Sequence, residues 1–190
     1  DGNGNFTDGS RNFGTGNDDT RSVAFGDVDG DKDLDIAVGN CRGQNVVYLN
    51  DGNGNFRAGT RNLGTENDDT RSVAFADVDG DKDLYIVVRN LNQQNAVYLN
   101  DGNGNFTTET KNFGIGDRTL SVVFADVDGD KDLDIAVRNL NQQNVVYLND
   151  GNGNFTAEFK PFGTGGGQNM DVNNLVARGS AQHGGLTLLK

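Results

Sequence analysis

The stretch DVDGDKDLDIAV (residues 27–38) places aspartates at alternate positions and then runs directly into an apolar segment. Its acidic residues are Asp27, Asp29, Asp31, Asp33 and Asp35, and only Lys32 offsets them locally. Carboxylates that converge in one loop repel each other, and this repulsion destabilises a fold unless a positive charge lies among them. The stretch therefore predicts one of two things: a solvated acidic turn or a loop that holds a cation.

The same pattern recurs along the chain at a nearly constant spacing. The acidic stretch begins at Asp27, Asp77 and Asp126, and the sequence DGNGNF begins at Asp1, Asp51, Asp101 and Asp150. Successive DGNGNF copies are 50, 50 and 49 residues apart. A period of this length indicates a repeat architecture, so we expect one repeat domain over residues 1–190.

Four repeats are expected in this domain, and the last is degenerate. They cover about 1–50, 51–100, 101–149 and 150–190. In the fourth, LVARGSAQHGGLTLL (residues 175–189) aligns with DIAVGNCRGQNVVYL (residues 35–49), which places Leu189 on Leu49. This copy is shortened, and DVNN stands where the others have the acidic stretch.

Each repeat is predicted to form four short strands separated by turns. In the first repeat the candidates are SVAF, LDIAV, NVVYLN and, more weakly, NFTDGSRNF. Asn-Gly and Asp-Gly steps supply the positive φ angles of tight hairpin turns. Four short antiparallel strands in about 50 residues are typical of one β-propeller blade. Because a single blade cannot bury both faces, we expect stacked blades with these residues and their counterparts between them: Phe25, Ile36, Val38, Val47 and Phe56.

The predicted fold class is therefore all-β, a β-propeller of about four four-stranded antiparallel blades. Residues 1–13 are expected to supply the fourth strand of the last blade and to close a small ring between the termini. Four blades stand at the small end of the propeller range. Two alternatives stay open, in which two chains pair into a larger ring or the chain is part of a longer ring or array.

The chemistry of the acidic stretch favours calcium as its cation. Its ligands are hard oxygens with no His or Cys nearby, and Ca²⁺ takes six to eight oxygens in flexible geometry, whereas Mg²⁺ demands a stricter octahedron. The loop is not an EF-hand, because Gly30 stands at the fourth place rather than the sixth and Val38 stands where the terminal glutamate belongs.

The stretches FGDVDGDKDLDIAVGN, FADVDGDKDLYIVVRN and FADVDGDKDLDIAVRN, each followed by VYLNDGNGNF, resemble the FG-GAP/VCBS repeat family. The resemblance implies calcium bound by side chains of the first, third, fifth and ninth loop places and by the carbonyl of the seventh. In the first loop these are Asp27, Asp29, Asp31 and Asp35, with Asp33 through its carbonyl. In the third loop they are Asp126, Asp128, Asp130 and Asp134, with Asp132 through its carbonyl.

The second loop departs from the pattern at one place. It offers Asp77, Asp79, Asp81 and Asp83, but its ninth place is Tyr85, a neutral phenol and a poor calcium ligand. We therefore expect two strong Ca²⁺ sites and a weaker or empty site in the second repeat. No site is expected in the shortened fourth copy, which retains Asp171 and Asn173.

Composition limits the function. The net charge of −12 argues against nucleic acid and anionic lipid, and no apolar stretch reaches the length of a membrane span. One His and one Cys, with no catalytic constellation, argue against an enzyme. The resemblance implies an extracellular or cell-surface calcium-binding propeller that serves structure, adhesion or protein interaction.

The expected partner is a protein or glycan ligand at the cell surface. A lectin-like propeller is one alternative, because the amides of NLNQQN (residues 90–95 and 139–144) are suited to hydrogen-bonding sugar, although a polar hairpin explains them equally well. A self-assembling subunit of a fibre or surface array is the other, in which free blade faces drive a homo-oligomer or filament.

Overall fold

A computed structural model gives the fold and describes residues 13–14, 16–64, 68–113, 119–158 and 188–189. Within these ranges the chain is all-β, with no helix and three antiparallel sheets, two of four strands and one of five. The described residues accordingly contain no helical segment long and apolar enough to cross a lipid bilayer.

Each sheet is a meander in which sequence neighbours pair. The first blade consists of β1 (Thr20–Gly26), β2 (Asp35–Asn40), β3 (Asn45–Asn50) and β4 (Phe56–Leu63). The second consists of β5 (Thr70–Ala76), β6 (Tyr85–Asn90), β7 (Asn95–Asn100) and β8 (Phe106–Phe113). The third consists of β9 (Thr119–Ala125), β10 (Asp134–Asn139), β11 (Val145–Asn149) and β12 (Phe155–Glu158). Each described blade thus has four strands, and its fourth strand comes from the start of the following repeat. The weak fourth strand predicted for the first repeat, NFTDGSRNF, lies almost wholly outside the described residues.

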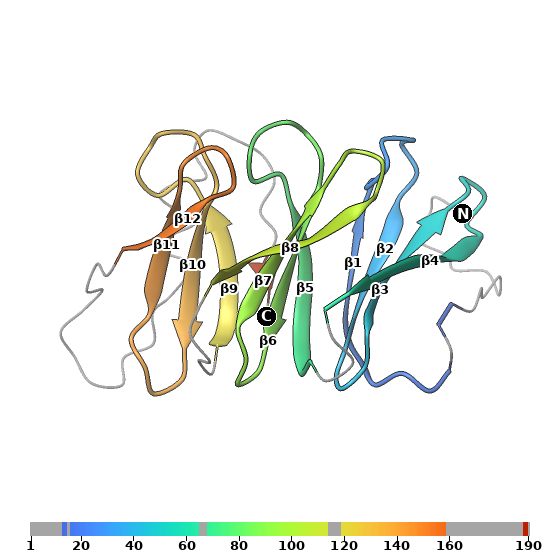
Figure 1. Ribbon diagram of the computed structural model, residues 1–190, viewed down its shortest axis with the longest axis horizontal. Coiled ribbons are helices and arrows are strands. Elements are labelled where there is room, and N and C mark those ends of the chain that lie inside the picture. The colour runs from blue at the N-terminus through green and yellow to red at the C-terminus, as the bar shows by residue number, and fades with distance from the viewer. Residues whose placement is uncertain (1–12, 15, 65–67, 114–118, 159–187, 190) are drawn as a thin grey trace, which may run out of the picture.

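The three blades stand side by side in a row (Figure 1). The sequence predicted about four blades in a closed ring, whereas the described residues form three blades and no closed ring. Leu189, aligned with the third strand of a fourth blade, instead belongs to β13 (Leu188–Leu189), which pairs with β9 as a fifth strand of the third sheet. The predicted closing strand at residues 1–12 and the remainder of the fourth copy, residues 159–187, lie outside the described residues.

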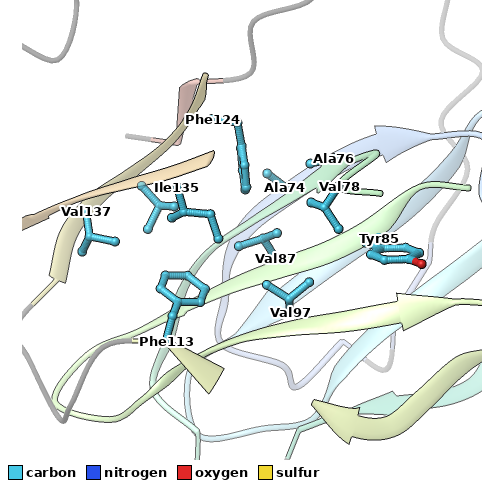
Figure 2. Packing of buried hydrophobic residues seen from close by; sticks show 11 residues of the cluster. Ala74, Ala76, Val78, Tyr85, Val87, Val97, Phe113, Phe124, Ile135 and Val137 are labelled. Carbon is cyan, nitrogen blue, oxygen red and sulfur yellow. The ribbon is translucent and has the colours of Figure 1, made fainter. Parts of the chain in front are cut away.

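Apolar layers between the blades form the core, and strand alternation builds them. In β5, Val73 and Phe75 face the first blade while Ala74 and Ala76 face the third. Figure 2 shows the second layer, in which Phe124 and other third-blade side chains lie against the second blade. Because side chains alternate between two packed faces, β5, β6 and β7 of the middle blade are almost continuously buried.

The first blade departs from its prediction at Phe25. This residue was expected between blades, but it is 60% exposed, whereas its counterparts Phe75 and Phe124 are 7% and 6% exposed. Those two counterparts lie on the face that packs against the preceding blade. Among the described residues no blade precedes the first one, so Phe25 keeps its solvent contact.

A buried polar ladder joins the blades at the end of the strands away from the acidic loops. The side-chain amide of Asn45 donates to the Thr70 hydroxyl at 3.0 Å, and that hydroxyl donates to the side-chain oxygen Oδ1 of Asn90 at 2.9 Å. The same relay runs from Asn95 through Thr119 to Asn139. This ladder was not predicted from the sequence, although Thr and Asn recur at fixed positions of the repeats and were the available signal.

Candidate metal centres

The acidic loops connect the first two strands of each blade and lie along the upper edge of the molecule in Figure 1. We name them the first loop (residues 27–35), the second loop (77–85) and the third loop (126–134). In the first loop the Asp27 carboxylate accepts hydrogen bonds from the amides of Gly30 at 2.8 Å and Lys32 at 3.0 Å. These bonds coil the backbone around the carboxylates, and both donors take positive φ angles of 75° and 76°.

In each loop, carboxylate oxygens of three aspartates converge within 4.8 Å of one another. The clusters are Asp27, Asp29 and Asp35 in the first loop, Asp77, Asp79 and Asp81 in the second, and Asp126, Asp128 and Asp134 in the third. The first and third clusters therefore use the predicted first, third and ninth places. The predicted ligands Asp31 and Asp130, at the fifth place, lie in these loops but outside the clusters, and their role stays a prediction.

The ninth-place aspartate of the first and third loops is the buried member of each cluster. Asp35 is fully buried and accepts the backbone amides of Val28 at 3.0 Å and Asn50 at 2.9 Å, one on each oxygen. Asp134 accepts the amides of Val127 and Asn149 in the same way. Burial raises the pKa of both carboxyls, and the amide bonds oppose this shift only in part. Each oxygen keeps a lone pair for another partner.

Asp29 supplies the clearest indication that the first loop is built for a cation. Its Oδ1 atom is buried and has no hydrogen-bond partner in the described structure. Burial raises the pKa of this carboxyl, and the nearby Asp31 adds to the effect. A buried acceptor without a donor is costly in a protein interior, and a cation between the three carboxylates satisfies it. The residues present thus fit a hard divalent ion such as Ca²⁺.

The seventh-place carboxylates point away from the clusters, toward the DGNGN hairpins. A Cβ atom added to Gly52 would lie 2.5 Å from Oδ2 of Asp33, and Gly102 and Gly151 meet Asp83 and Asp132 equally closely. These glycines also have positive φ angles of 75–76°. The positive φ angle favours glycine at these positions, and any larger residue would also displace the neighbouring carboxylate. The predicted ligand role of Asp33, Asp83 and Asp132 stays a prediction.

The second loop is built differently around Tyr85. The phenol is buried and donates a hydrogen bond to Oδ2 of Asp79 at 2.6 Å. Burial and this bond raise the pKa of Tyr85, so the ring remains a neutral donor. The cluster here includes the exposed Asp81 instead of a buried ninth-place carboxylate. The loop thus has one fewer buried charge and an internal donor for one of its carboxylates.

A side-chain contact between neighbouring blades reaches the loops, and it was not predicted from the sequence. The Asn100 amide, at the end of β7, donates to the Val28 carbonyl in the first loop at 2.8 Å and to the Leu84 carbonyl in its own blade at 3.2 Å. Asn149 bonds the Val78 and Leu133 carbonyls in the same manner. The recurring asparagine of VYLN was visible, but a single sequence gives no sign that it reaches across a blade boundary.

Comparison with protein families gives one result that bears on these loops. A family model described as an FG-GAP-like repeat matches three consecutive, overlapping segments, residues 27–88, 77–137 and 126–175. Together these segments span well over half of the chain, and each begins at the first aspartate of an acidic loop. No curated protein matches the sequence.

Proposed function

The chain belongs to the FG-GAP-like repeat family, and from that premise we propose that it is a non-catalytic, calcium-binding β-propeller module. In this proposal the stacked blades form a rigid platform for structure, adhesion or protein interaction outside the cell. The family membership and the three propeller-like blades support the integrin-like architecture.

The observation that carries the calcium proposal is the pair of matched clusters in the first and third loops. Each brings together three carboxylates, of which one is fully buried between two strands. Three converging negative charges destabilise the metal-free fold, and a divalent cation reverses that effect. Oxygen-only ligands on a flexible loop suit Ca²⁺ better than transition metals. Oxygen sites in extracellular modules are tuned to the millimolar calcium found outside cells.

Calorimetric titration with calcium and thermal unfolding with and without EDTA test this proposal. We expect two strong sites, and each stabilises the fold by about 2.7 kcal/mol when calcium is a hundred times its dissociation constant. The control is a variant in which the first- and third-place aspartates of all three loops are changed to Asn, and it should unfold at the same temperature in calcium and in EDTA. These residues are Asp27, Asp29, Asp77, Asp79, Asp126 and Asp128. An unchanged melting temperature of the native chain with chelator would refute the proposal.

A protein partner is favoured over a glycan by the placement of the aromatic residues. The chain has no Trp, and Tyr48, Tyr85 and Tyr98 are each only 6% exposed. These three tyrosines, which combine an aromatic face with a polar tip, therefore offer little surface for stacking on a sugar ring. The NLNQQN amides are also engaged within the protein, since Gln93 accepts the Asp69 amide and Asn95 donates to Thr119. A glycan array that detects calcium-dependent binding would reverse this preference.

Self-association is the second candidate, and the first blade favours it. Val23, Phe25 and Leu34 are 49%, 60% and 56% exposed. Their counterparts in the second blade bury against a neighbouring blade. We infer that two copies pair through this face, because apolar patches of this kind mark protein contacts. Light scattering should give a dimer mass that Phe25→Ser reduces to that of a monomer; a monomeric native chain would refute it.

A further inference from the structure

We propose that Asn100 and Asn149 are positioning residues that couple the first and second loops, respectively, to the blade that follows each. The inference rests on the proposed calcium function and adds that a residue of one blade tunes the affinity of the preceding blade's loop. Asn100 acts from the second blade on the first loop, and Asn149 acts from the third blade on the second loop.

The contact falls at a sensitive place in the loop. The Val28 carbonyl that accepts from Asn100 lies between Asp27 and Asp29, two members of the first cluster. The Val28 amide on the other side donates to the third member, Asp35. Asn100 and Asp35 together therefore hold Val28 by its carbonyl and its amide. Val28 precedes Asp29, whose buried Oδ1 has no partner in the described structure, so its position sets the direction of that carboxylate.

Both asparagines are buried, and their side-chain amide groups join two neighbouring blades through hydrogen bonds. Asn100 is 6% exposed and Asn149 is 5% exposed. In both, the amide group donates to two backbone carbonyls, one in each of two neighbouring blades. Their Oδ1 atoms are buried and have no hydrogen-bond partner among the described residues. The side-chain amide thus makes both donor bonds while its oxygen accepts none. That arrangement costs free energy, which the double donation offsets.

The first blade supplies a natural comparison. Asn50 stands at the same repeat position, and its amide donates to the Leu34 carbonyl of its own blade at 3.2 Å. Its Oδ1 accepts the Gly54 amide at 3.1 Å, unlike the oxygens of Asn100 and Asn149. The side chain thus turns its oxygen to its own hairpin where, among the described residues, no blade precedes it. The added donation to the preceding blade, which Asn100 and Asn149 make and Asn50 does not, therefore goes with the blade boundary.

Coupling through this contact is reciprocal. If Asn100 stabilises the cation-binding form of the first loop, a cation in that loop strengthens the joint between the first and second blades by the same factor. The third loop has no equivalent donor in the described part of the chain, so its affinity is independent of Asn100. Calcium binding to the first or second loop then strengthens the contact between that loop's blade and the blade that follows it.

The coupling is tested in two variants that each keep a single intact cluster. The first-loop background keeps the first loop, and its substitutions to Asn are at Asp77, Asp79, Asp126 and Asp128. The third-loop background keeps the third loop, and its substitutions to Asn are at Asp27, Asp29, Asp77 and Asp79. Calcium affinity is measured by calorimetry at a temperature where circular dichroism shows each protein to be folded. We expect Asn100→Ala to weaken calcium binding in the first-loop background by about three- to tenfold, the scale of one lost hydrogen bond. The same substitution should leave the third-loop background unchanged within twofold.

Two controls separate positioning from general damage. Asn100→Leu keeps the side-chain volume while removing the donor, and it should reproduce the effect of alanine. Asn50→Ala in the third-loop background should have no effect. Equal weakening of both loops by Asn100→Ala, or none in the first, would overturn the coupling while leaving calcium binding intact. Absence of calcium binding in both backgrounds before Asn100 is changed would overturn the proposed function instead.

Discussion

The first and second loops differ by one decisive residue in a nearly identical sequence. The first has Asp35 at its ninth place, fully buried and held by two backbone amides. The second has Tyr85, whose phenol donates to Asp79. The acceptor in one loop is thus replaced by a donor in the other. One loop needs an external positive charge, whereas the other partly satisfies its own carboxylates.

The largest expected effect comes from removing the buried charge. Asp35→Asn keeps the shape of the side chain but removes its charge, so it should weaken calcium binding in the first loop by roughly one to two orders of magnitude. The number of tight sites measured by calorimetry should fall from two to one. Tyr85→Asn, matched in position, should leave two tight sites. Equal losses from both substitutions would show that the ninth place does not distinguish the loops.

The converse substitution should create a site. Tyr85→Asp restores the ninth-place carboxylate and removes the donor to Asp79, so the second loop should gain about tenfold or more in calcium affinity. The metal-free protein should lose about 2–4 kcal/mol of stability, because Tyr85 packs in the layer between the second and third blades. Titration should then count three tight sites, and Tyr85→Asn should count two. Two tight calcium sites in both Tyr85→Asp and Tyr85→Asn would show that the ninth-place residue does not explain the difference between the loops.

The fold was largely predictable because its signals are local and repeated. The strands, the turns and the four-stranded blade as a unit follow from a period of about 50 residues and from alternating apolar positions. The clusters followed from carboxylates at alternate places, since strand ends bring them to one loop. The number of blades did not follow, because β13 pairs with β9 rather than in a sheet of its own. An edge pairing of Leu188 and Leu189 leaves no trace in local sequence.

The contacts between blades were the other part beyond the reach of sequence. Phe25, Phe75 and Phe124 stand at the same repeat position, yet the first is exposed and the others are buried. Nothing in the residue itself distinguishes them, since the difference comes from what lies ahead of each blade. The Asn100 contact depends on the same geometry.

A smaller effect concerns pH in the absence of calcium. The pKa of Asp35 and of Asp134 is raised above the ordinary value of 3.8 by burial. Below pH 3.8 both carboxyls are protonated in the folded and in the unfolded chain, so they do not lower the free energy of unfolding. As pH rises above it, the unfolded chain releases protons first, so stability falls until the folded pKa is passed. In EDTA, the melting temperature of the native chain should therefore decline over this range relative to Asp35→Asn.

The aspartates of the DGNGN hairpins provide an internal check on this pH dependence of the melting temperature. Hydrogen bonds from Asn55 and Asn105 lower the pKa of Asp51 and of Asp101, so their contribution is lost only as pH falls below 3.8. The two groups of carboxyls thus act in different pH ranges. A melting temperature in EDTA that rises steadily from pH 4 to 7, with no difference between the native chain and Asp35→Asn, would contradict the assigned sign.

The smallest expected effect comes from deleting a single oxygen atom in the second loop. Tyr85→Phe retains the ring in its apolar layer but removes the donor to Asp79. The metal-free protein should lose about 1–2 kcal/mol, because a hydrogen bond to a charged acceptor is stronger than a neutral one. Calcium affinity of the second loop should rise slightly, since Oδ2 of Asp79 is released for a cation. Chemical unfolding in EDTA and titration in calcium should therefore move in opposite directions. If both fell together, the phenol would be acting as a ligand rather than as a substitute for the cation, and the contrast between the loops would lie elsewhere.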